Sequence, residues 1–299
     1  MSAVDTSRAH LEDMVGRYRE ALAARDASSL PLVPDLRFTE NAQALSLSEG
    51  LWGTATGVDA PQLVCLDPVN ESAGFFALAH EHGEPVGLGV RLKLSAGAIS
   101  EIETIVARPP TLIFDPDGMK RPGPGFGDVD PAARASRIEL VAAANAYFDG
   151  IEQDDGGIIP ARAECVRVEN GVRTVLADAS TFGSSTADQG LNLFTMGVCE
   201  QIDTGFFAYI PRIRSRRFPV IDEVRSVVMA GVVFDQPGTM TQIRLNDGRD
   251  IVLPPLFRRP SSVLILEAFQ VDGGRIRAIN AVLDFCQYGI QPGWPAGRL

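Results

Sequence analysis

The stretch RYREALAARDASSLPLVPDLRFTENAQAL, residues 17–45, decides the fold because a second version of it occurs later in the chain. Residues 146–174 read AYFDGIEQDDGGIIPARAECVRVENGVRT. The matched positions, all at one constant offset, are Tyr18 with Tyr147, Asp26 with Asp155, Glu40 with Glu169 and Asn41 with Asn170. A repeat of this length without gaps predicts two copies of one folding unit.

Each copy opens with a helical pattern. Leu11, Val15, Tyr18 and Leu22 recur at helical spacing, which places Tyr18 on the buried face, and the second copy has the same spacing around Tyr147. Each copy then becomes rich in β-branched and aromatic segments, which are separated by turn sequences such as HGEP and NDG. A helix followed by antiparallel strands predicts an α+β fold.

The domain organisation follows from the repeat and from one compositional break. Pro, Gly and Asp crowd the region between the copies, which is typical of a linker. We therefore expect a first module over residues 1–110, a linker over 111–134, a second module over 135–290 and an irregular tail over 291–299.

Composition limits the possible partners. The 299 residues are 45% hydrophobic and carry a formal net charge of −11, so no general basic field exists to attract nucleic acid or an anionic membrane. Without a signal peptide pattern or a long apolar run, we expect a soluble cytoplasmic protein. The cysteines form no C-x-x-C pair and have no neighbouring histidine, so we expect free thiols and no metal site.

The motifs RYREALAARD and FTEN resemble the opening of ketosteroid isomerase and the SnoaL-like cyclases, members of the nuclear transport factor two superfamily. The resemblance implies two tandem cone-shaped modules, each a curved, mostly antiparallel sheet wrapped around N-terminal helices and enclosing an apolar pocket. It also implies that Tyr18 and Tyr147 lie where the isomerase keeps its oxyanion-stabilising tyrosine.

One position departs from the isomerase pattern. Where that enzyme has a carboxylate base, this chain has Asn41 and Asn170, and an amide cannot accept a proton at neutral pH. The adjacent Glu40 and Glu169 are expected to face the other side, because neighbouring strand residues alternate. Isomerase chemistry is therefore not implied.

Two longer stretches, residues 36–57 and 91–108, together with the tandem layout, resemble the sphingomonad diarylpropane lyases. This resemblance implies a cofactor-independent homo-oligomeric lyase for a small hydrophobic aromatic substrate. A phenolic diol derived from lignin would lose its benzylic hydroxyl to give a quinone methide, and carbon–carbon cleavage would then release formaldehyde. A dehydratase, isomerase or cyclase of the same superfamily is one alternative. A non-catalytic ligand-binding or dimerisation module is another.

The candidate residues fall into two groups. For catalysis they are Tyr18, Asn41, His80, Lys93 and Glu103. For substrate binding they are Trp52, Arg91, Tyr147, Asn170 and Arg217. Tyr18 and Trp52 are equally consistent with core packing, since a buried phenol needs only one partner. His80 has the near-neutral pKa that suits an acid or base, whereas His82 fits an exposed hairpin.

Charged residues on strands leave further alternatives open. Arg91 and Lys93 alternate along one strand, Glu101 and Glu103 along the next, and the pairs form either a solvent-exposed ladder or a set facing a cone interior. A basic cluster later in the chain suits carboxylate or phenolate ligands, or else salt bridges between copies or subunits. The members of this cluster are Arg212, Arg214, Arg216 and Arg217. Further polar candidates on strands of the second copy are Asp222, Glu267 and Asn280.

Overall fold

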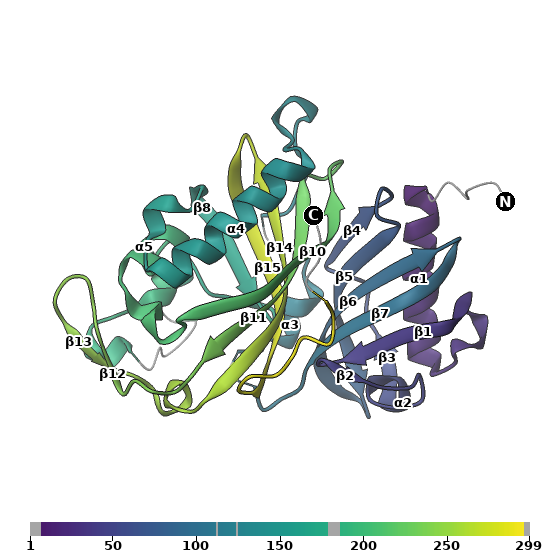
Figure 1. Ribbon diagram of the computed structural model, residues 1–299, viewed down its shortest axis with the longest axis horizontal. Helices are drawn as coiled ribbons and strands as arrows, with labels where there is room; N and C mark the ends of the chain where they lie inside the picture. Colours follow the sequence, from purple (N-terminus) through teal and green to yellow (C-terminus); the bar gives the residue numbers. More distant parts are fainter. Residues whose placement is uncertain (1–6, 112, 124, 179–185, 296–299) are drawn as a thin grey trace.

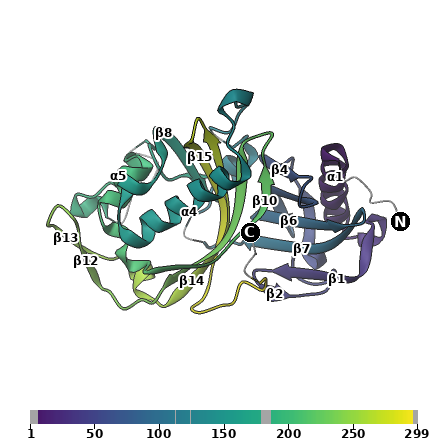
Figure 2. The same ribbon diagram turned by 45° about the horizontal axis from the view of Figure 1, so that its top comes forward.

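A computed structural model describes residues 7–111, 113–123, 125–178 and 186–295. Two curved sheets stand back to back in the middle of the molecule, and a long helix covers the outer side of each (Figures 1 and 2). The α+β class is therefore confirmed. Within the described ranges, no helix is both long and apolar enough to span a membrane.

The first half is a seven-stranded sheet with one long helix. Its sheet order is β2-β1-β7-β6-β5-β3, with β4 paired to β5. Its elements are α1 (Arg8–Ala24), η1 (Ala27–Ser29), β1 (Leu32–Glu40), β2 (Gln43–Ala44), α2 (Leu51–Thr54), β3 (Ala55–Val58), β4 (Leu63–Asp67), β5 (Ser72–Glu81), β6 (Glu84–Ser95) and β7 (Ala98–Ala107).

The second half is a six-stranded sheet with the order β10-β11-β14-β15-β8-β9, accompanied by a small β12-β13 hairpin. Its elements are α4 (Arg137–Gln153), η3 (Gly156–Ile158), β8 (Ala161–Glu169), β9 (Val172–Arg173), η4 (Ala187–Gln189), η5 (Leu193–Thr195), α5 (Val198–Asp203), η6 (Phe206–Tyr209), β10 (Arg212–Asp222), β11 (Val227–Gln236), β12 (Gln242–Arg244), β13 (Asp250–Val252), η7 (Pro255–Arg258), β14 (Ser261–Asp272) and β15 (Arg275–Gln287).

The two sheets share one topology. In each half the first long strand runs parallel to the last, β1 beside β7 and β8 beside β15, whereas the other pairings are antiparallel. Helix α1 packs against β3, β4 and β5, and α4 packs against β10, β11 and β14. The repeat in the sequence therefore corresponds to a repeat in the strand connections.

The repeated residues at the helix ends explain part of the sequence match. Both long helices end at a residue in the left-handed conformation, Arg25 with φ 55° and Asp154 with φ 51°. The next residues, Asp26 and Asp155, each accept a hydrogen bond from a backbone N–H two positions on and so start a short 3₁₀ turn. The repeated aspartates thus have a capping role.

The predicted linker over 111–134 is partly regular. It contains α3 (Pro116–Lys120) and η2 (Pro131–Ala133), and the Asp115 N–H donates to the Asn170 carbonyl. Gly118 and Gly171 lie so close that a Cβ on either would collide with the backbone of the other segment, and Gly171 has φ +84°. The linker is therefore docked on the turn between β8 and β9.

A hydrophobic core joins the two sheets. It is separate from the cores that lie under α1 and α4. Its buried members are Leu63, Cys65, Phe76, Leu78, Ile105, Met119, Val220, Val227, Met229, Val233, Leu264, Leu266, Ala268 and Val282. Because so many apolar side chains are buried between the sheets, their back-to-back contact is itself a hydrophobic core.

Reciprocal ion pairs frame this contact. Arg8, at the start of α1, binds Asp222 at the end of β10 with Nη1–Oδ1 2.6 Å. Arg137, at the start of α4, binds Asp67 at the end of β4 with Nη1–Oδ1 2.9 Å. Both aspartate side chains are fully buried, and each also accepts a backbone N–H from the strand of the other half. An aspartate of each half therefore binds the first residue of the long helix in the other half.

The described part of the predicted tail is anchored on the first half. Trp294 is buried, and its Nε1 donates to Thr39 Oγ1 at 2.8 Å. The guanidinium groups of Arg37 and Arg91 lie 4.2 and 4.5 Å from the centroid of its ring. The chain end described here therefore ties the second half back to the first.

The reciprocal pairs predict a measurable stability effect. Asp222→Asn and Asp67→Asn should each lower the free energy of unfolding by roughly 2 to 4 kcal/mol, because each removes a fully buried carboxylate that accepts from a guanidinium and from backbone N–H groups. Asp250→Asn is the matched control, because its pair with Arg244 is exposed and worth at most about 1 kcal/mol. Urea denaturation measures all three. Equal small losses in the three variants would contradict this account.

Candidate functional site

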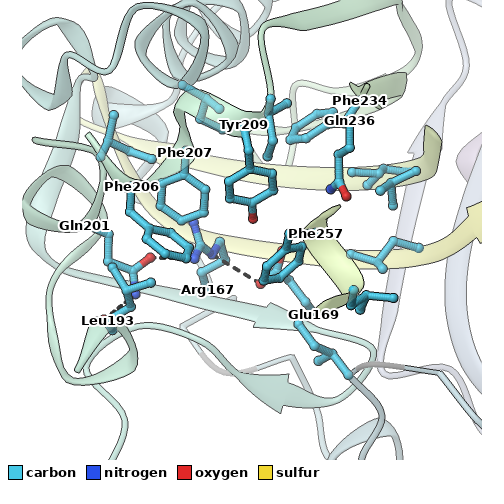
Figure 3. Close-up of a pocket in the computed structure, with 18 of the residues that line it drawn as sticks. Arg167, Glu169, Leu193, Gln201, Phe206, Phe207, Tyr209, Phe234, Gln236 and Phe257 are labelled. Atoms are coloured by element: carbon cyan, nitrogen blue, oxygen red, sulfur yellow. Dashed lines mark hydrogen bonds and ion pairs between the residues drawn. The ribbon is translucent and has the colours of Figure 1, made fainter. Parts of the chain in front are cut away.

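The second half contains a cavity of about 350 Å3 between its sheet and the covering segments (Figure 3). The volume lies at the lower end of the roughly 300 to 1,000 Å3 that is usual for small-molecule sites. Most of the described lining is apolar. Its aromatic members are Tyr147, Phe194, Phe206, Phe207, Tyr209, Phe234, Phe257 and Phe285. The ring of Tyr209 stacks on that of Phe257 with 4.7 Å between centroids.

Arg167, on β8, organises the polar end of the cavity. Its side chain is buried, and its Nε donates to Thr174 Oγ1 at 2.9 Å. Its Nη1 donates to the Tyr147 hydroxyl at 3.2 Å and its Nη2 to Gln201 Oε1 at 2.6 Å. Glu169, two residues along the same strand, places Oε2 3.5 Å from Arg167 Nε. Both charged groups line the cavity.

Two phenols and a buried acid adjoin this ion pair. Figure 3 shows the Tyr209 hydroxyl directed toward Arg167 and Glu169. Burial raises the pKa of Tyr209 and of Tyr147 above the usual value, so both remain protonated. Burial, with a smaller contribution from Glu169, raises the pKa of Glu267 to about 8 despite the opposing effects of Arg167 and Tyr147. At neutral pH, Glu267 is therefore mostly a neutral carboxylic acid behind Tyr147.

The cavity has walls that the first half lacks. Residues 174–211 join β9 to β10, and residues 237–260 join β11 to β14. In the first half the corresponding connections are the shorter segment 45–62 and the tight turn 82–83. The longer connections supply α5, η6 and η7, which carry Gln201, Tyr209 and Phe257. The two insertions therefore provide much of the aromatic wall.

Side chains fill the corresponding interior of the first half. Tyr18 and Trp52 are buried and meet edge to face with 5.5 Å between ring centroids, and the Phe75 ring lies 6.0 Å from that of Tyr18. The Tyr18 hydroxyl and Trp52 Nε1 are both buried, and no described residue offers either a hydrogen-bond partner of acceptable geometry. These two candidates thus lie in a packed core, whereas Tyr147 lines a cavity.

Asn41 and Asn170 occupy equivalent turns at the ends of β1 and β8, each with φ 45°. The Asn41 side chain pairs with the backbone N–H and carbonyl of Val106, and that of Asn170 pairs with those of Leu283. Asn41 Nδ2 also donates to Asp284 Oδ2 at 2.9 Å. Both amides therefore pin a turn to the last strand of their half and have little capacity left for a ligand.

Glu169, and not Asn170, lines the cavity, so the expected orientation of this pair is wrong. The expectation took Asn170 as the inward-facing residue of the pair, whereas alternation along β8 directs Glu169 inward. Glu169 instead continues the face set by Arg167, two residues earlier. In the first half Glu40 is buried, caps the Leu51 N–H and binds Arg108.

Arg91, Glu103 and Arg217 meet between the two sheets. Glu103 lies opposite Arg91 in the β6–β7 register, with Nε–Oε2 3.0 Å, and Arg217 Nη2 reaches Glu103 Oε1 at 2.6 Å. All three are buried. The pairing is thus neither an exposed ladder nor part of a cone interior but a bridge between the halves. Lys93 lies farther along β6, where its Nζ donates to the Asn70 carbonyl.

The histidines and the other arginines lie outside the cavity. His80 Nε2 is 3.2 Å from Asp59 Oδ1 at a partly exposed position, and His82 is in the β5–β6 turn with φ 52°. Arg212 and Arg214 bind Asp235. Arg216 binds Asp149 and Glu152 on α4, and no residue in the described ranges hydrogen-bonds to the side chain of Asn280. Among the described residues, no group of three or more acidic, His or Cys side chains is placed to hold a metal ion.

The sequence pointed to Tyr147, which lines the cavity, and to Glu267 behind it, but not to Arg167, Gln201, Tyr209 or Phe257. Arg167 and Glu169 are two residues apart in a strand, so their side chains point to the same face of the sheet. The sequence of residues 161–169 therefore did contain a signal for this ion pair. Gln201, Tyr209 and Phe257 stand in insertions with no counterpart in the first copy, and internal comparison could not place them.

The raised pKa of Glu267 predicts how stability depends on pH. Between about pH 4.5 and 8 the folded protein keeps a proton that the unfolded chain releases, so the free energy of unfolding falls as pH rises, by at most about 1.4 kcal/mol per pH unit. Glu267→Gln should flatten the profile in this window. The exposed Glu12→Gln serves as the control. Urea denaturation at several pH values measures the slopes, and parallel profiles for wild type and Glu267→Gln would contradict the assignment.

Comparisons with known proteins give one family and two partial structural likenesses. A de novo designed protein with a curved β-sheet is 19% identical with a TM-score of 0.28, covering 34% of this chain and 88% of that one. A protein of unknown function with a cystatin-like fold from Methylobium petroleophilum PM1 is 16% identical with a TM-score of 0.29, covering 36% and 81%. No curated protein matches. The model of the family described as a domain of unknown function, DUF8021, matches residues 133–283 of the 299, and the chain belongs to that family.

Proposed function

We propose that the chain is a cofactor-independent lyase that acts on a hydrophobic phenolic substrate in the cavity of the second half. The observation that carries this proposal is the Arg167–Glu169 pair at one end of an aromatic cavity, with two protonated tyrosines beside it. An apolar wall with a few convergent polar groups is the usual form of a site for a small organic molecule.

The polar end has the parts for acid–base chemistry. The Glu169 carboxylate is an acceptor for a substrate proton. Arg167 and the hydroxyls of Tyr147 and Tyr209 are donors for an oxygen that gains negative charge, and their low-dielectric surroundings strengthen each interaction. Protonated Glu267, which lies behind Tyr147, is a proton donor for the reaction. In this proposal, these five residues take the catalytic roles that the sequence analysis gave to residues of the first half.

The specific reaction comes from the resemblance of the sequence to diarylpropane lyases. A phenolic propanediol would give a stilbene, formaldehyde and water. Glu169 would take the proton of the hydroxyl whose carbon leaves as formaldehyde, and the proton for the departing benzylic hydroxyl would come from Glu267 through Tyr147. A dehydratase, isomerase or cyclase would use the same groups on a different substrate, and a pure binding protein would use them without turnover.

The finer description of the fold is also part of the proposal. We infer that the halves are divergent SnoaL-like modules in which the first lost its pocket and became a scaffold. The equivalent tyrosines Tyr18 and Tyr147, one packed and one lining a cavity, support this inference. A cytoplasmic location and assembly into a homo-oligomer remain predictions.

Turnover by Glu169→Gln tests the proposed base. Each diastereomer of 1,2-diguaiacylpropane-1,3-diol is incubated with purified protein, and stilbene absorbance and formaldehyde are followed. Glu169→Gln should slow product formation by about 100-fold or more, because the amide accepts no proton. Glu164→Gln, an exposed position on the same strand, should keep full activity. If wild type gives no product with either diastereomer, the lyase proposal fails.

The paired tyrosines provide a second test, which locates the active half. Tyr147→Phe should reduce kcat about tenfold or more, since it removes a hydroxyl beside Arg167. Tyr18→Phe should leave both kcat and thermal stability unchanged or slightly improved, because the deleted hydroxyl is buried and bonds to no described residue with acceptable geometry. A loss of activity confined to Tyr18→Phe would move the site to the first half.

A further inference from the structure

A second polar group faces the cavity away from the Arg167–Glu169 pair. Gln236, the last residue of β11, lines the cavity, and its side chain is almost wholly buried. Its Oε1 accepts from Ser261 Oγ at 3.2 Å. No described residue accepts a hydrogen bond from its Nε2. Figure 3 shows this amide among the apolar lining residues. Gln236 therefore brings an available donor to the cavity surface, where a ligand or water can accept from it.

The sheet keeps the two polar groups apart. β11 and β8 are separated by β14 and β15, so three strand spacings, about 14 Å, lie between their backbones. Glu169 and Gln236 both line the cavity, and most of its other described lining residues are apolar. This arrangement matches an elongated molecule with an apolar body and a polar group at each end.

The charges of the cavity restrict the ligand further. Among the described lining residues Arg167 and Glu169 are the charged ones, and they neutralise each other. Gln236 brings no charge to the far end. A carboxylate there would lose its hydration without gaining a counter-ion, which is strongly unfavourable. The cavity therefore suits an uncharged ligand.

We propose that Gln236 determines specificity by donating a hydrogen bond to a neutral acceptor, such as a carbonyl or ether oxygen, at the far end of the ligand. The hydroxyl at the near end of the same ligand is held by Glu169 and Tyr209. The inference rests on the proposed function in one respect, since it takes the cavity as the substrate site, and it narrows the substrate class to uncharged aromatic molecules with an oxygen at both ends.

Three naphthol probes of one shape test this inference. 6-Acetyl-2-naphthol has the far acceptor, 6-ethyl-2-naphthol lacks it, and 6-hydroxy-2-naphthoate replaces it with a charge. Affinities are measured by naphthol fluorescence at pH 6.5. The wild type should bind the acetyl probe about three- to tenfold tighter than the ethyl probe, the range for one net hydrogen bond, and should bind the naphthoate most weakly.

Gln236→Met removes the donor and keeps the side-chain length. It should bind the acetyl and ethyl probes with equal affinity, whereas the exposed Gln242→Met should behave like wild type. A wild type without acetyl preference, a preference that survives in Gln236→Met, tightest binding of the naphthoate, or no binding of any probe would each overturn the inference.

The binding assay is independent of the proposed reaction. Glu169→Gln should weaken the acetyl and ethyl probes by the same factor, so the ratio that reports on Gln236 stays as in wild type. A Gln236-dependent acetyl preference in a protein that never forms stilbene would sustain the inference and reject the lyase. Stilbene formation without that preference would support the lyase and reject the inference about Gln236.

Discussion

The exchange of arginine and aspartate between the halves is the interaction on which the rest of the structure depends. Arg8 and Arg137 each start a long helix, and each is held by an aspartate of the other half. Asp67 and Asp222 have fully buried side chains, and each accepts one backbone N–H from its own half and one from the other half. The back-to-back arrangement therefore supplies partners that an isolated half would lack.

This dependence separates stability from ligand binding. The first half needs its tightly packed interior, with Tyr18, Trp52 and Phe75, and it supplies one side of the shared core. The second half instead contains a cavity, and the apolar contacts of the shared core contribute stability that offsets the packing lost there. Long connections in the second half then provide walls without disturbing the sheet, since loops tolerate insertion better than strands.

The internal repeat allowed much of the fold to be predicted, but only part of the site. The α+β class, the helix that opens each copy and the buried position of both tyrosines follow from spacing. The orientation of Glu169 did not follow, because the resemblance to the isomerase took Asn170 as the inward residue, whereas Glu169 shares the cavity face with Arg167. The association of Arg91 and Glu103 with Arg217 is a contact between distant segments, and no local pattern encodes it. The cavity walls stand in insertions, where the repeat carries no information.

The central claim is that the second half alone holds the ligand site. A crystal of the full chain soaked with 4-bromophenol tests it directly, since the bromine is located by anomalous scattering. The account predicts a bromine peak inside the cavity bounded by Phe206, Tyr209 and Phe257, with the phenol oxygen near Glu169. Bromine beside Tyr18 and Trp52, or only on the outer surface, would contradict it.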